Sequence, residues 1–241
     1  MRVLWVLSLA ILLLGSCKHG FRRVEGNGVL ETVEKSLGDF EKVEVSGSFK
    51  VKVIPSGENK VSFTTDENLK KYILIDQDGN RVRIRTKNNV NIKPTKSIEV
   101  VLYGNQISKF ELAGSSTLRS EGVLENDDRI EVVIAGSGDA NLSIKTPETK
   151  VRIGGSGKVS LEGKTRDSKV NIAGSGDYLS ENLMSENVEI SIAGSGNARV
   201  FASVDLKINI AGSGDVYYTG KPSNVKKNIA GSGRIKSDES Q

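Results

Sequence analysis

The chain repeats one short phrase at nearly constant spacing, and this repeat limits its possible folds more than any other feature. Val170 to Tyr178 read VNIAGSGDY, and variants of the phrase recur from Ala113 to Ala230 at intervals of 18 to 22 residues. This period is shorter than that of the common helical repeats, and its glycines disfavour helix. The repeat therefore predicts a β-solenoid with coils of about 19 residues.

Apolar residues alternate with other residues just before each turn. Val132 and Ile134 precede one turn, and Ile190 and Ile192 precede another. Period-two alternation indicates a half-buried strand. One coil of two short strands cannot bury its apolar side chains, whereas stacked coils can, each adding about 4.8 Å of length. We therefore predict an all-β fold of stacked parallel coils, with a less regular β-rich N-terminal half.

The Gly-Ser-Gly turn recurs because every coil meets the same corner. Glycine accepts positive φ there, and a larger residue would collide with the coils above and below. We predict a structural role for the paired glycines of these turns. They are Gly136, Gly138, Gly155, Gly157, Gly174, Gly176, Gly194, Gly196, Gly212, Gly214, Gly231 and Gly233.

The residue after each turn provides a separate test of stacking. Like charges one strand apart destabilise a sheet, while opposite charges and amides stabilise it. No two aspartates occupy neighbouring coils in this column, so we predict an outward-facing ladder of alternating sign. Its members are Asp139, Lys158, Asp177, Asn197, Asp215 and Arg234.

The N-terminus has the features of a secretory signal. A basic start is followed by the apolar run VLWVLSLAILLL and the small residues of LGSC, and the run is too short for a membrane-spanning helix. The LGSC segment resembles the lipobox of bacterial lipoproteins. That resemblance implies cleavage between Ser16 and Cys17 and lipidation of Cys17, the single cysteine. The alternative is an ordinary signal peptide followed by a chance cysteine.

These features divide the chain into four parts. Residues 1–16 are expected to be the signal peptide, 17–38 a tether, 39–236 a single β-helix domain and 237–241 a charged tail. Lys227 replaces the usual valine or isoleucine in the last coil, as expected of a polar cap. We expect a lipid-anchored protein of the cell envelope, with the outer membrane favoured. The membrane side stays open, because basic residues follow Cys17 where surface-exported lipoproteins carry acidic ones.

The chain offers little for catalysis or metal binding. Its one histidine, His19, excludes histidine metal clusters and Ser-His-Asp triads. GGSGK at Gly154 to Lys158 departs from the phosphate-loop motif, and calcium-binding repeats need a period of nine. The net charge of +4 is spread along the strands, so no nucleic-acid partner is expected. We predict no catalytic residue, cofactor or metal.

Three stretches together resemble one known family. They are FEKVEVSGSFKVKVIPSG from Phe40, the repeated IAGSG, and GSGDVYYTGKP from Gly212. The region from Phe40 to Lys236 resembles the head GIN domain family of Bacteroidota, described as adhesin heads of auto-transporters. The resemblance implies a right-handed parallel β-helix, similar to pectin-lyase folds without their catalytic residues, and a role in adhesion.

Three functions follow as hypotheses. The first is a non-catalytic, lipid-anchored envelope protein that binds the membrane through its lipid and a polysaccharide or an envelope or matrix protein through its solenoid. The second is a carbohydrate-active enzyme of polysaccharide-lyase type, which would need lysine or arginine and two or three carboxylates in one groove. The third is a purely structural envelope protein. Fold alone does not supply an activity, so the first is favoured over the second.

Overall fold

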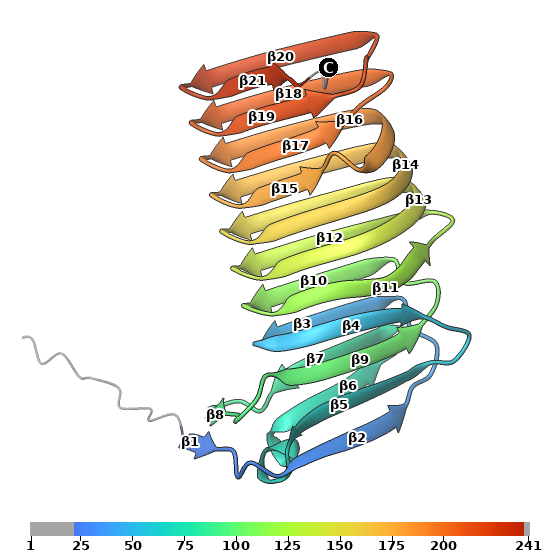
Figure 1. The fold of residues 1–241 in the computed structure, drawn as a ribbon, viewed down its shortest axis with the longest axis vertical. Helices are drawn as coiled ribbons and strands as arrows, with labels where there is room; N and C mark the ends of the chain where they lie inside the picture. The colour runs from blue at the N-terminus through green and yellow to red at the C-terminus, as the bar shows by residue number, and fades with distance from the viewer. Residues whose placement is uncertain (1–21, 239–241) are drawn as a thin grey trace, which may run out of the picture.

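Parallel pairing between consecutive coils builds the molecule, as the repeat predicted (Figure 1). The computed structural model describes residues 22–238 as a β-solenoid of about six turns, with 72% strand and 3% helix. The predicted fold class is therefore confirmed. In the part of the chain that the structure describes, no helix is long and apolar enough to cross a membrane.

The elements follow one another in this order: β1 (Arg22–Glu25), β2 (Leu30–Ser36), β3 (Lys42–Gly47), β4 (Phe49–Pro55), β5 (Lys60–Asp66), the 3-10 helix η1 (Glu67–Tyr72), β6 (Ile73–Asp78), β7 (Arg81–Thr86), β8 (Val90–Lys93), β9 (Ile98–Gly104), β10 (Lys109–Gly114), β11 (Thr117–Glu125), β12 (Arg129–Gly136), β13 (Asp139–Gly155), β14 (Lys158–Gly174), β15 (Asp177–Ser180), β16 (Leu183–Gly194), β17 (Asn197–Phe201), β18 (Asp205–Gly212), β19 (Asp215–Thr219), β20 (Asn224–Gly231) and β21 (Arg234–Ser237).

Each coil contributes to two sheets that face each other across the core. Sheet 1 begins with the N-terminal strands β6, β7 and β3 and continues with the strands that run into the repeated turns, in the order β10, β12, the second half of β13 and onward to β20. Sheet 2 begins with the N-terminal strands β2, β5, β9 and β4 and continues with the strands that follow the repeated turns, in the order β11, the first half of β13 and onward to β21. β13 and β14 run unbroken from one sheet to the other, where two short strands were predicted.

The core consists of columns of aliphatic side chains stacked in register. Val132 pairs with Val151, and Val151 pairs with Val170 in the next coil. All three are at most 1% exposed. Tyr178 is fully buried among them, with its hydroxyl 3.2 Å from the Ser168 hydroxyl. The stacked columns leave the alternate residues of each strand on the outer surface.

The two glycines of each turn are required for different reasons. The first adopts positive φ, as at Gly174 with φ +124°, and the amide of the following Ser175 donates to the carbonyl of Gly155 one coil below at 2.9 Å. The second glycine does not adopt positive φ. A Cβ on Gly176 would instead lie 2.6 Å from the carbonyl oxygen of Gly157, because the coils approach closely. Positive φ is thus confined to the first glycine of the pair.

The N-terminal strands close one end of the solenoid with antiparallel pairs. β2 pairs with β5, and β6 pairs with β7. Residues 22–38, assigned to a tether in the sequence, include β1 and β2, so the folded region begins before residue 39. The short helix η1, between β5 and β6, was also not expected in an all-β fold.

A buried carboxylate fastens this end together. Asp66 is fully buried and accepts hydrogen bonds from the Gly28 amide at 2.7 Å and from the Thr95 amide and hydroxyl at 2.9 and 2.7 Å. Burial alone would raise the pKa of Asp66, but these hydrogen bonds outweigh it and hold the pKa below its ordinary value. Asp66 therefore links the segment before β2 to the loop before β9.

Candidate binding groove at the second corner

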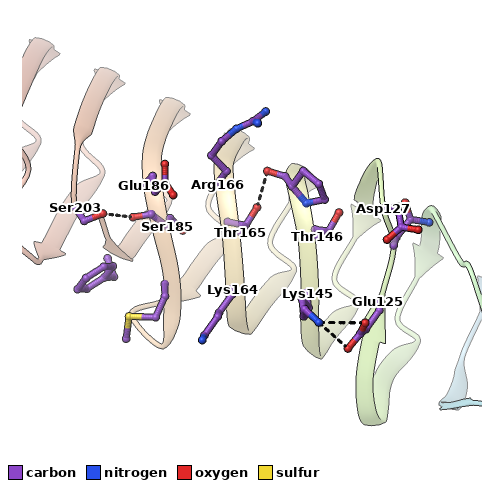
Figure 2. A pocket seen from close by; sticks show the side chains of 14 residues that line it. Glu125, Asp127, Lys145, Thr146, Lys164, Thr165, Arg166, Ser185, Glu186 and Ser203 are labelled. Atoms are coloured by element: carbon purple, nitrogen blue, oxygen red, sulfur yellow. Dashed lines mark hydrogen bonds and ion pairs between the residues drawn. The ribbon is translucent and has the colours of Figure 1, made fainter.

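A groove of about 550 Å³ lies at the corner opposite the Gly-Ser-Gly turns (Figure 2). The chain bends from sheet 2 to sheet 1 at this corner in successive coils, and the groove crosses several of them. The residues that line it are Glu125, Asn126, Asp127, Lys145, Thr146, Pro147, Lys164, Thr165, Arg166, Met184, Ser185, Glu186, Phe201 and Ser203.

The floor of the groove is a column of small polar side chains that bond the backbone. The Thr165 hydroxyl donates to the Pro147 carbonyl at 3.2 Å, and the Ser203 hydroxyl donates to the Ser185 carbonyl at 3.3 Å (Figure 2). Thr165 and Ser185 are buried. Because these hydroxyl hydrogens satisfy carbonyls of the bend, the floor stabilises the corner and can offer a ligand only acceptor oxygens.

One wall of the groove is a column of charged residues in adjacent coils. Glu125, Lys145 and Lys164 stand in register on β11, β13 and β14. Lys145 Nζ lies 3.3 Å from both carboxylate oxygens of Glu125 (Figure 2). Lys164 lies beside the like charge of Lys145, and among residues 22–238 no carboxylate lies within ion-pair distance of it. The ammonium group of Lys164 is thus the one in this wall that forms no ion pair with the described residues.

The rim of the groove carries a second set of charges. Arg166 Nε lies 2.8 Å from Asp167, and this hydrogen bond, with the attraction between the two charges, raises the pKa of Arg166. Asp167 also accepts a hydrogen bond from Asn187 at 2.8 Å. Burial would raise the pKa of Asp167, but the bonds from Asn187 and Arg166 lower it. Arg166 is therefore paired, unlike Lys164.

Apolar side chains lie at the end of the groove nearer the C-terminus. Met184 follows Lys164 in register and is 48% exposed, and Phe201 lines the groove in the next coil. An exposed methionine beside a partly exposed phenylalanine gives an adaptable apolar surface. The groove thus combines one free cation, exposed carboxylates and an apolar end.

This composition meets the requirement named for the enzyme hypothesis, since lysine, arginine and three carboxylates share one groove. All of these charged side chains are exposed, however, and two of the cations are held in ion pairs with Glu125 and Asp167. A catalytic base needs an environment that brings its pKa near the working pH, usually by burial. The groove therefore suits ligand binding better than proton transfer.

The residues predicted from the sequence lie away from this groove. The paired glycines form the opposite corner, next to the ladder that starts at Asp139. That ladder is confirmed: Asp139, Lys158 and Asp177 stand in register, and Arg234 Nη2 lies 2.5 Å from Asp215. Cys17, Ser16 and His19 lie outside the described residues. Within the described range, no cluster of metal-ligating side chains occurs.

The polar floor column and the charged wall column of the corner groove were not predicted from the sequence, and neither was a second groove. A shallow groove of about 540 Å³ runs along sheet 1 over the last coils, between the outward Asn171, Ser191, Asn209 and Asn228 and the neighbouring alanines. Asn228 donates to Asn209 at 3.0 Å. The polar residue before Ile-Ala in each repeat was the available signal for this second groove.

The described residues thus form a β-solenoid with open, exposed grooves. The family described as "Putative auto-transporter adhesin, head GIN domain" matches residues 39–222, and the chain belongs to this family. A search of curated proteins gave no match.

Solved structures of similar proteins agree with this assignment. A protein titled "Putative lipid binding protein" from Parabacteroides distasonis ATCC 8503 is 26% identical, with a TM-score of 0.76 over 90% of this chain and 99% of that one. A "putative adhesin" from Bacteroides fragilis NCTC 9343 is 19% identical, with a TM-score of 0.81 over 89% of this chain and 99% of that one. A "putative adhesin" from Parabacteroides merdae ATCC 43184 is 19% identical, with a TM-score of 0.71 over 90% and 99%. The last two show the fold alone.

Proposed function

We propose that the chain is a lipid-anchored, non-catalytic binding protein of the bacterial cell envelope. Its solenoid would serve adhesion or the binding of envelope polymers or proteins. Membership of the adhesin-head family and the titles of its structural relatives support a binding role. The LGSC segment before residue 18 supports lipid attachment at Cys17.

The observation that carries the proposal is the direction of the solenoid relative to its N-terminus. β1 and β2 lie at one end of the stack, and β20 and β21 lie at the other (Figure 1). Each coil adds about 4.8 Å along the axis. A lipid at Cys17 would therefore hold the first strands near the membrane and present the corner groove and the last coil away from it.

The corner groove is the proposed contact for a glycan. The apolar face of one sugar ring can pack on Phe201, while other units of the same glycan bond Lys164 through acidic groups and Glu125 through hydroxyl groups farther along the groove. A second candidate is an amphiphilic lipid. It is favoured by the position of Lys164 beside the exposed Met184 and by the lipid-binding title of the relative from P. distasonis.

Lipid attachment is tested by metabolic labelling with an alkyne fatty acid. The unchanged protein should incorporate label and fractionate with membranes, whereas a Cys17→Ala variant should do neither. Equal labelling of both proteins would contradict the anchor. Protease digestion of intact and permeabilised cells would show which membrane face carries the solenoid.

The binding role is tested with residues 18–241, which contain every strand of the structure. A panel of envelope and host glycans, anionic lipid vesicles and matrix proteins is screened while sugar products are assayed. Lys164→Gln should weaken binding, and the matched Lys158→Gln, on the same strand at the opposite corner, should not. Release of unsaturated or reducing sugars would overturn the non-catalytic assignment. Absence of any binding would favour the structural role.

A further inference from the structure

The last coil, β20 with β21, has a neighbouring coil on one side only. All eight residues of β20 are exposed, whereas the equivalent strand β18 alternates between buried and exposed positions. Among the described residues no strand or loop pairs with the far edge of β20. The end of the solenoid that is distant from the N-terminal strands is therefore an open sheet edge (Figure 1).

The hydrogen bonds define which backbone groups of β20 are free. The Asn224 amide donates to Val204 at 3.1 Å, and the Ser232 amide donates to Gly212 at 3.0 Å. Because the direction of backbone groups alternates along a strand, the even-numbered residues face the stack. The N–H and C=O groups of Val225, Lys227 and Ile229 therefore point out of the end, where a further strand can bond them.

The side chains of the same residues extend the core columns. Val225 pairs with Leu206 and Ile229 pairs with Ile210. Leu206 and Ile210 are 2% and 3% exposed, but Val225 and Ile229 are 40% and 45% exposed. A strand that adds to β20 with aliphatic residues at these two positions would bury them as every other coil buries its predecessor.

Between these aliphatic residues stand two adjacent lysines. Lys226 faces outward, and Lys227 takes the core column above Ile208. Lys227 Nζ lies 3.3 Å from the Tyr218 hydroxyl and 4.9 Å from its ring centroid. β20 carries no acidic residue. An identical basic edge would be repelled, and a strand with carboxylates opposite both lysines would be attracted.

We propose that the last coil docks an extended acidic segment of a partner protein, which adds to β20 as a parallel strand. Main-chain bonds to Val225, Lys227 and Ile229 would provide affinity, and the two lysines would select acidic side chains. The segment has aliphatic residues opposite Val225 and Ile229 and Asp or Glu opposite Lys226 and Lys227. This interaction goes beyond the proposed function and requires neither the lipid anchor nor the corner groove.

The probe is the last coil's own sequence with both lysines changed to glutamate. A fluorescent peptide NVEENIAGSG, which matches Asn224 to Gly233 except at these two positions, is titrated against residues 18–241. We expect saturable binding, with the native-sequence peptide NVKKNIAGSG at least tenfold weaker because its lysines meet Lys226 and Lys227. Equal affinity for the two peptides would overturn the proposed selectivity.

Two protein variants distinguish docking at the edge of β20 from general charge attraction. Lys226→Glu/Lys227→Glu should weaken NVEENIAGSG binding at least tenfold. The matched Lys150→Glu/Lys169→Glu makes the same charge change in coils whose edges are covered, and should leave affinity unchanged. Equal losses in both variants would show simple charge attraction and refute docking at the edge.

Amide hydrogen exchange tests strand addition without relying on a variant. The peptide should slow exchange at Val225, Lys227 and Ile229 and leave interior coils unaffected. Binding without this protection would refute the added strand. Light scattering tests whether the protein associates with itself. Self-association that Lys226→Glu/Lys227→Glu abolishes would also overturn the proposal, because the occupant of the edge would then be a second copy.

Discussion

Three alanine substitutions can separate the two physical reasons for glycine at the solenoid corner. Gly79→Ala changes a residue with φ +57° and no atom within 4 Å of the new Cβ, so only backbone strain applies. Gly176→Ala changes a residue without positive φ, so only close contacts apply: the new Cβ would lie 2.6 Å from Gly157 O and closer still to Ile153 Cγ2. Gly174→Ala combines φ +124° with a Cβ 2.5 Å from Gly155 O.

The expected losses of unfolding free energy follow from these geometries. Left-handed backbone costs alanine about 1–2 kcal/mol, so Gly79→Ala should lose about that amount. Overpacking typically costs about 1–3 kcal/mol. Gly176→Ala should reach the upper part of that range, because the new Cβ meets both the Ile153 side chain and a backbone carbonyl of the preceding coil. Gly174→Ala should lose about 3–5 kcal/mol, since both terms apply.

Guanidinium unfolding followed by circular dichroism measures these differences. From the highest denaturant midpoint to the lowest, the predicted order is wild type, Gly79→Ala, Gly176→Ala and then Gly174→Ala. A Gly176→Ala midpoint equal to or above that of Gly79→Ala would refute close coil stacking as the reason for the second glycine.

Two further predictions concern buried polar groups. Because hydrogen bonds lower the folded-state pKa of Asp66 below its ordinary 3.8, its stabilising contribution is complete above that value and is lost as the pH falls through the folded pKa. Below about pH 4, the unfolding midpoint of the wild type should therefore decrease more steeply with falling pH than that of Asp66→Asn. Asp66→Asn should also lose about 1–3 kcal/mol of unfolding free energy at neutral pH. Parallel pH curves for the two proteins would contradict this role. Tyr178→Phe should cost about 1–2 kcal/mol in the same assay, since it leaves the buried Ser168 hydroxyl without this partner, and an unchanged midpoint would show that the bond contributes nothing.

The repeat made the stacked coils predictable because both of its signals are local. Alternation marks the inward residues, and glycine marks the first corner. The second corner lacks such a marker, because Thr165 and Ser185 become a column only when the register aligns them. The corner groove also depends on the relative sizes of Lys164, Met184 and Phe201 in different coils, and spacing along the chain does not encode those sizes.

The N-terminal end was harder to predict for a different reason. Its strands β2, β5 and β6 reverse direction, so their spacing has no period and their pairing depends on distant residues. Asp66 illustrates this, since its partners Gly28 and Thr95 lie far from it in the sequence. The C-terminal end was easier, because Lys227 interrupts a column that the earlier coils fill with apolar residues.

The charge ladder beside the turns has a consequence for how the length of such a protein can change over time. Deleting the single coil that carries Lys158 would bring Asp139 next to Asp177, and deleting the one that carries Asn197 would bring Asp177 next to Asp215. Removing either of these two coils alone, or duplicating a single coil that carries an aspartate, stacks like charges, whereas removing or duplicating neighbouring coils in pairs does not. Lengthening and shortening by an even number of coils is therefore the less disruptive route open to this chain.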